Sequence, residues 1–170
     1  MKFNELKELW LADASKYIQK INNKDIVKLY FTVPGFKRLS SYFSTKNRLI
    51  YKFLTMIILK HYSIKFGIDI SPMTRIGKGL AIFHFGGIVI HGDAKIGDNL
   101  NIRQGVTIGD THKGVPVIGD NVYIGAGGKV IGNVKVGNNV KIGANTVVIK
   151  NVPDNCSVVG FSARYICHEK

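Results

Sequence analysis

The chain has 170 residues, a formal net charge of +13, and 45% hydrophobic residues. This length allows one domain with a modest appendage, and the apolar content is enough to form a core. Two cysteines exclude a disulfide framework, so Cys156 and Cys167 are expected to be free thiols in a reducing compartment. The longest apolar run, at residues 53–59, is too short to cross a bilayer, and no secretory leader is visible. We therefore expect a cytoplasmic protein.

The positive charge is concentrated at the N-terminal end. Residues 1–68 hold 13 basic and 4 acidic side chains, whereas residues 69–170 hold 11 and 7. A basic appendage can contact an anionic partner such as a membrane surface, a nucleic acid or a phosphorylated substrate. The simpler interpretation, a solvated basic face, is favoured. Among these partners, the inner face of the membrane stays open as an alternative, and nucleic acid is not expected.

Residues 1–66 are predicted to form an α-helical region. Apolar residues recur at steps of three and four over residues 3–21, which indicates an amphipathic helix. Residues 25–31 suit a short second helix, closed by the turn-forming residues 33–35. Thr45 can cap a third helix that runs to about Tyr62. This helix is apolar on nearly all sides, so burial against the rest of the protein or a second subunit is favoured over membrane contact.

Residues 67–170 carry aliphatic residues at every sixth position. Three runs keep this step: Ile70, Ile76, Ile82 and Ile88; Ile90, Ile96, Ile102 and Ile108; and Ile118, Ile124, Val130, Val136, Ile142 and Val148. A period of six is neither helical nor a simple alternation, and it fits a β-solenoid with one short strand per wall. Positions four residues after a rung are also small or branched, giving two inward residues per wall.

Two places break the six-residue step. The phase shifts by two between Ile88 and Ile90, and ten residues separate Ile108 from Ile118. The second break contains residues 109–116, and insertions in repeat proteins form loops on a functional face.

Several segments resemble the left-handed β-helix acyltransferases of hexapeptide repeats, and within them the serine acetyltransferase-like group. The matching segments are residues 69–72, 76–79, 84 with 87–90, 104–109, 124–127 and 160–164. The resemblance implies a left-handed parallel β-helix, a homotrimer, and an acetyl-CoA-dependent O-acetyltransferase whose acetyl-CoA lies between neighbouring subunits. The handedness rests on the resemblance alone.

The same resemblance implies a catalytic pair, His84 and Asp69. Transfer of acetyl to a hydroxyl needs a base at the acceptor oxygen, and imidazole titrates near neutral pH. His84 would take the proton and Asp69 would orient its ring. A coil of three six-residue walls would place Asp69 one coil below His84, and coils stack at roughly 4.8 Å, so contact is feasible.

The resemblance also implies the residues that contact acetyl-CoA. Small residues along the later coils would let the pantetheine arm approach the backbone amides, and lysines could pair with the phosphates. These residues are Gly109, Gly125, Ala126, Gly143 and Ala144, with Lys141 and Lys150. Ordinary solvated lysines remain an equal alternative for the last two, and no metal is expected.

The chain departs from the serine enzymes at the acceptor site. Phe83 stands where those enzymes carry an aspartate, Gly114 and Val115 replace an arginine and a histidine, and the helical region is shorter. Without the arginine an amino-acid carboxylate loses a bidentate partner. We therefore expect the acceptor to be a hydroxyl of a sugar or glycan precursor, contacted by Phe83, Phe85 and His112. Serine O-acetylation in cysteine biosynthesis is the alternative.

Two other classes of protein fit the sequence less well. Trimeric carbonic anhydrases on this fold hold zinc with histidines, but His84, His91 and His112 contain no closely spaced pair. A non-catalytic scaffold would leave the register of Asp69 and His84 unexplained.

Overall fold

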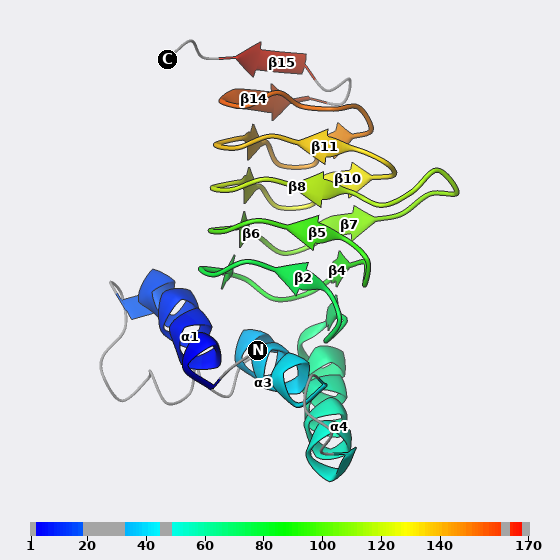
Figure 1. Cartoon of the computed structure of the whole chain (residues 1–170). Helices are drawn as coiled ribbons and strands as arrows, with labels where there is room; N and C mark the ends of the chain where they lie inside the picture. Colours follow the sequence, from blue (N-terminus) through cyan, green and yellow to red (C-terminus); the bar gives the residue numbers. More distant parts are fainter. Residues whose placement is uncertain (1–2, 19–32, 45–48, 161–163, 168–170) are drawn as a thin grey trace.

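The computed structural model describes residues 3–18, 33–44, 49–160 and 164–167. Three helices come first: α1 (Phe3–Ile18), α3 (Val33–Ser44) and α4 (Leu49–Phe66). The strands that follow stack as flat coils into a solenoid, and the helices lie at its N-terminal end (Figure 1). No helix in these described ranges is long and apolar enough to cross a membrane.

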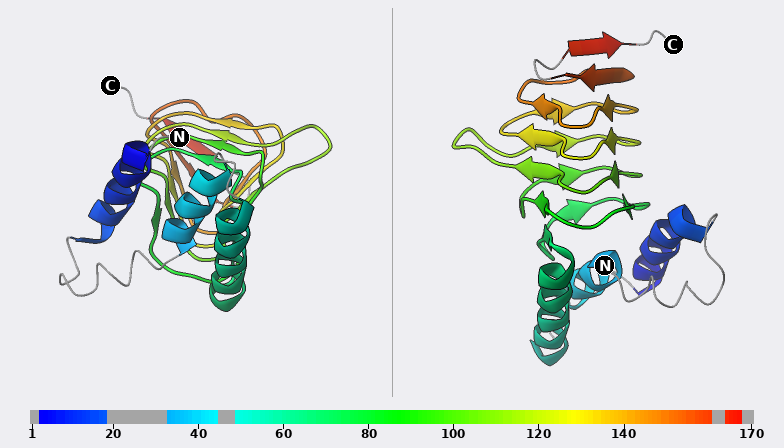
Figure 2. Two further views of the ribbon diagram at one scale, coloured as in Figure 1. Left: turned by 60° about the horizontal axis from the view of Figure 1, so that its bottom comes forward. Right: turned by 180° about the vertical axis from the view of Figure 1, so that it is seen from behind.

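Each of the first four coils contributes one strand to each of three sheets, and the tilted view on the left of Figure 2 shows a three-sided outline. Sheet A contains β1 (Ile68–Ile70), β4 (Ile88–Ile90), β7 (Thr107–Gly109), β10 (Lys129–Ile131) and β13 (Val147–Val148). Sheet B contains β2 (Arg75–Ile76), β5 (Lys95–Ile96), β8 (Val117–Ile118) and β11 (Lys135–Val136). Sheet C contains β3 (Ala81–Ile82), β6 (Asn101–Ile102), β9 (Tyr123–Ile124), β12 (Lys141–Ile142), β14 (Cys156–Val159) and β15 (Arg164–Cys167).

The core of the solenoid is the ladder that the sequence predicts. The rungs point inward and nearly all are buried; Ile102, Ile108, Ile124, Ile142 and Val148 are fully so. The positions four residues later are buried as well: Ala94, Leu100, Val106, Val122, Val134, Val140 and Thr146. Two inward side chains per wall fill a thin tube, and the β-solenoid prediction is confirmed.

The register explains both breaks in the period. Val89 pairs with Thr107 and Lys129 with Val147, so these coils have the eighteen residues of three regular walls. Asp69 pairs with Val89, which makes the first coil two residues longer. Thr107 pairs with Lys129, which makes the third coil four residues longer.

The sequence pattern places the shorter break inside β4, whereas the structure has it in the corner before this strand. Ile82 pairs with Ile102 and Ile90 with Ile108, so the two extra residues lie between Ile82 and Ile90. They widen the corner from sheet C to sheet A at residues 83–87, and Ile88 itself remains a buried residue of β4. An isoleucine on each side of the inserted corner made the shift look later than it is.

Asparagines in the left-handed conformation form most corners between sheets B and C. Asn99, Asn121, Asn139 and Asn155 have φ between 55° and 59°. Their side-chain amides form a ladder, each Nδ2 donating to the Oδ1 of the next coil at 3.0, 3.2 and 3.0 Å. Asparagine tolerates this backbone conformation, and the ladder satisfies its side chain.

Helix α3 corrects the prediction for residues 33–35. These residues begin a helix instead of closing one, because proline in a first turn loses no intrahelical hydrogen bond. The predicted helix at residues 25–31 lies outside the described residues, as does the predicted cap Thr45.

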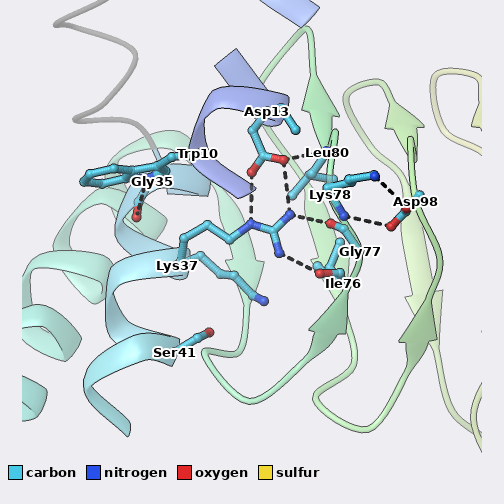
Figure 3. Close-up of polar contacts among 12 residues, drawn as sticks. Trp10, Asp13, Gly35, Lys37, Ser41, Ile76, Gly77, Lys78, Leu80 and Asp98 are labelled. Carbon is cyan, nitrogen blue, oxygen red and sulfur yellow. Dashed lines mark hydrogen bonds and ion pairs between the residues drawn. The ribbon is translucent and has the colours of Figure 1, made fainter. Parts of the chain in front are cut away.

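Helices α1 and α3 cover the open edge of the first coil through a buried ion pair (Figure 3). Asp13 of α1 and Arg38 of α3 are 5% and 2% exposed. Arg38 donates to the Asp13 carboxylate from Nε at 2.9 Å and from Nη2 at 3.1 Å, and Asp13 also accepts the Leu80 amide at 2.8 Å. Arg38 donates further to the carbonyls of Ile76 and Gly77. The cluster therefore supplies partners for backbone groups on an edge that has no further coil.

Lys37 adds a second buried cation to this cluster. Its Nζ donates to the Thr74 carbonyl at 2.7 Å, and its side chain is 2% exposed. Burial lowers the pKa of Lys37 from 10.5 to about 7; Arg38 lowers it further, and Asp13 opposes them. Near neutral pH this lysine is therefore only partly protonated.

The third helix is less buried within the chain than its composition suggests. Thr55, Leu59 and Ser63 pack toward the rest of the protein. Leu49 and Ile50, in contrast, are 80% and 74% exposed, and Phe53, Leu54, Ile57 and Ile64 are also exposed. The prediction that this helix packs against the solenoid therefore holds for one face only. The second-subunit alternative stays a prediction.

The cysteines differ from the prediction of free thiols. Cys156 in β14 and Cys167 in β15 form a disulfide across the antiparallel pair of strands that ends sheet C. No sequence pattern indicates this disulfide, because the pairing depends on β15 folding back against β14 in direct register.

Candidate active site

His84 lies on the widened corner between sheets C and A. It follows β3 by two residues and is exposed. Phe83 before it is half-buried, and the Arg103 guanidinium of the next coil lies 4.4 Å from the centre of its ring. Phe85 after it is 67% exposed and packs against Phe66 of α4, with ring centres 5.2 Å apart. The two extra residues thus place His84 on an exposed corner of the solenoid, between Phe83 and Phe85 in the sequence.

Asp69 is in the middle of β1, on the outer face of sheet A, and its side chain is exposed. Its strand is joined to the His84 corner through Gly67, because the Ile88 amide donates to the Gly67 carbonyl at 3.0 Å. A Cβ on Gly67 would lie 3.2 Å from the Gly87 nitrogen and 3.3 Å from the Gly86 Cα. Asp69 and His84 therefore occupy neighbouring elements, but within the described chain no hydrogen bond or ion pair joins them.

A pocket of about 270 Å³ lies between α4 and sheet A, with Asp69 in its wall. The helix contributes Lys60, Ser63 and Ile64, and the rest of the wall is residues 67–69 with Ile88 and Val89. Ser63 is buried and Lys60 is exposed. Membrane contact is considered only for the helix as a whole, and no sequence pattern singles out Lys60 as a site residue. Its position in a pocket depends on how α4 packs, which no local pattern shows.

The residues predicted to contact acetyl-CoA lie on more than one edge of the three-sided solenoid. Gly125 and Ala126 follow β9, and Gly143 and Ala144 follow β12, so these four form a column above the His84 corner. Gly109 ends β7 and Lys150 follows β13, both at the opposite edge of sheet A. Lys141 is exposed on sheet C. One protomer therefore does not bring all seven residues together.

Glycine at position 125 also has a purely structural reason. A Cβ there would lie 2.7 Å from the Ala144 nitrogen of the next coil. Close stacking of the coils thus requires glycine at this position, whether or not the corner binds a ligand.

His112 lies in the projecting loop between β7 and β8, visible as the protrusion in Figure 1. The loop leaves the edge of sheet A that is opposite to the His84 corner, so His112 cannot complete the site of its own protomer. Below it, the His91 Nε2 lies 4.0 Å from the Asp110 carboxylate. No group of three or more His, Cys, Asp or Glu side chains in the described chain is placed to hold a metal ion.

Comparison with known proteins identifies the class first. The bacterial transferase hexapeptide (six repeats) family matches residues 116–150. Serine acetyltransferase 1, chloroplastic, of Arabidopsis thaliana is 48% identical over 119 residues, which are 68% of this chain and 38% of the plant protein. The fold and these repeats define a hexapeptide-repeat transferase with a left-handed parallel β-helix.

Solved structures narrow the class to one group. Serine acetyltransferase of Neisseria gonorrhoeae in complex with serine has a TM-score of 0.81 and 30% identity, covering 97% of this chain and 70% of that one. A serine acetyltransferase in complex with CoA has a TM-score of 0.77 and 30% identity, covering 96% and 70%. The chain belongs to the serine acetyltransferase family of hexapeptide-repeat acyltransferases. It spans half or less of the length of the curated relatives that it matches.

Proposed function

We propose that the protein is an acetyl-CoA-dependent O-acetyltransferase whose acceptor is serine. One observation carries the reaction type: an exposed histidine on an expanded corner of a serine acetyltransferase fold, with a carboxylate on the adjoining strand. The names of the relatives favour serine over the sugar or glycan hydroxyl that the sequence analysis preferred. A glycan acceptor has no support among these relatives.

In the proposed reaction, His84 takes the proton of the serine hydroxyl as its oxygen attacks the thioester carbonyl. The carbon–sulfur bond then breaks, and the imidazolium returns the proton to the CoA thiolate. Asp69 accepts a hydrogen bond from the other ring nitrogen, which orients the imidazole and stabilises its charged form. Because side chains at such sites often align only when substrate is bound, the lack of a direct contact in the free chain does not contradict this role.

We further propose a homotrimer. The residues with a predicted role lie on opposite edges of sheet A: His84 and the small corner residues on one, Gly109 and His112 on the other. A neighbouring subunit can place its loop beside the first subunit's His84, which one protomer cannot do. Acetyl-CoA would then lie along the column of small corner residues, where backbone amides are accessible. Light scattering that found a stable monomer at micromolar concentration would contradict the trimer and this site.

The activity is tested by incubating the purified chain with acetyl-CoA and a panel of acceptors, and following release of the CoA thiol. We expect L-serine to be the preferred acceptor over neutral sugars. The variant His84→Ala should lose roughly 10²–10⁴-fold in turnover, the usual contribution of a general base, and Asp69→Ala should lose less. If His84→Ala kept full turnover while His112→Ala lost it, the base would be on the loop.

A further inference from the structure

We infer that the pocket between α4 and sheet A binds the acceptor amino acid and that Lys60 holds its carboxylate. This inference rests on the proposed function, and it answers a question that the sequence leaves open. The projecting loop between β7 and β8 carries Gly114 and Val115. These positions correspond, by the family resemblance, to an arginine and a histidine of the serine enzymes. An amino-acid acceptor therefore needs another cation, and the structure offers one beside Asp69.

The lining of the pocket matches a small zwitterion. Most of the wall is apolar, formed by Ile64, Ile68, Ile88 and Val89, and only three side chains are polar. Lys60 supplies a positive charge, Asp69 a negative charge, and Ser63 a hydroxyl group. A few convergent polar groups in an otherwise apolar cavity are typical of sites for small molecules. A volume of about 270 Å³ is enough to hold an amino acid.

Lys60 is available for an anionic ligand. It makes no ion pair within the described chain, not even with Asp69 of the same pocket, and α4 itself contains no aspartate or glutamate. Ser63 lies one turn further along the helix, so both side chains face the same side. An ammonium and a hydroxyl group on one face can together donate to a carboxylate, and charged hydrogen bonds of this kind are among the stronger ones.

The pocket is also placed correctly for the reaction. Its Gly67 directly abuts Gly86 and Gly87 of the widened corner, two and three residues after His84. Phe85 of the same corner packs against Phe66 of α4, which fixes the helix beside the corner. A serine whose carboxylate is held by Lys60 can therefore direct its hydroxyl toward the imidazole.

The test is a direct binding titration of L-serine, followed by NMR. It uses the whole chain in the oligomeric state in which it purifies. We expect Lys60→Met to weaken serine binding roughly 10–100-fold, and Lys60→Arg to restore much of it. Lys65→Met is the matched control, because Lys65 is another exposed lysine of α4 that does not line the pocket. It should bind serine as the unmodified protein does.

Ethanolamine, which is serine without its carboxylate, identifies the group that Lys60 contacts. It should bind weakly to the unmodified protein and equally weakly to Lys60→Met, because the missing interaction is the same in both. In the thiol-release assay, Lys60→Met should raise the KM for serine by a similar factor and leave the KM for acetyl-CoA unchanged.

The outcomes separate this inference from the proposed function. Serine binding that depends on Lys60 without acetyl transfer would support the inference and reject the proposed activity. Acetyl transfer to serine with an unchanged KM in Lys60→Met would keep the activity and overturn the inference. Absence of serine binding to the unmodified protein, or equal losses for Lys60→Met and Lys65→Met, would also overturn it.

Discussion

Replacing Asp13 with alanine should detach the helical cap, formed by α1 and α3, from the first coil of the solenoid. The carboxylate accepts two hydrogen bonds from Arg38 and one from the Leu80 amide, in surroundings that leave Asp13 5% exposed. Its removal leaves a buried guanidinium that keeps two carbonyl partners but has no counter-ion. Breaking a buried pair in this way costs about 3–5 kcal/mol. For a chain of this size, that loss lowers the melting temperature by roughly 10 °C.

Two optical signals distinguish the cap from the solenoid. The single tryptophan, Trp10, is on α1 and donates from Nε1 to the Gly35 carbonyl at 3.3 Å, so its fluorescence reports docking of α1 on α3. Far-UV circular dichroism reports the whole chain. In Asp13→Ala we expect Trp10 to become exposed at a lower temperature or denaturant concentration than the strands unfold.

The matched control is Glu8→Ala, which removes an exposed carboxylate from the same helix and should change stability by less than about 0.5 kcal/mol. The double variant Asp13→Ala with Arg38→Met should be less destabilised than the sum of the single variants, since it buries no lone charge. The reasoning would be refuted by an Asp13→Ala protein that unfolds within 1 kcal/mol of the unmodified one, with unchanged Trp10 fluorescence.

Three further predictions concern stability. Because the pKa of Lys37 is about 7 in the folded chain and 10.5 in the unfolded chain, the unfolded chain binds more protons between these values. The free energy of unfolding should therefore rise with pH above 7, by at most about 1.4 kcal/mol per unit, and Lys37→Met should remove this increment in urea titrations. The variant Cys156→Ala with Cys167→Ala should lose about 2–3 kcal/mol and expose β15 to hydrogen exchange, as reduction of the unmodified chain should; exchange no faster than in the oxidised unmodified chain would contradict this. Asn121→Ala should lose about 1–3 kcal/mol in thermal unfolding, since it breaks two rungs of the amide ladder and places alanine, which tolerates the left-handed conformation less well than asparagine, at φ 56°. Asn121→Gly keeps that backbone conformation at no strain, and an equal loss in both variants would assign the whole effect to the ladder.

The repeated walls are what the sequence by itself determined. Rungs such as Ile102 and Ile124, preceded two residues earlier by the buried Leu100 and Val122, recur at a period that fits a coil of short walls. Each wall contacts its neighbours in the same register, so a local pattern is enough to specify the core. The two longer corners were visible as interruptions of that period. Their residues His84 and His112 could be named as candidates, although the first interruption was placed inside β4 and not in the corner before it.

Only the tertiary structure decided how the parts that do not repeat come together. Asp13 and Arg38 lie in different helices and meet at the edge of a coil formed by residues 76–80. Lys60 shares a pocket with Asp69, and Cys156 meets Cys167 across a reversed strand. Nothing in the local sequence distinguishes these side chains from solvated lysines, ordinary ion pairs or free thiols. Their roles depend on contacts between segments distant in sequence, which are fixed by packing and desolvation and not by any period of the chain.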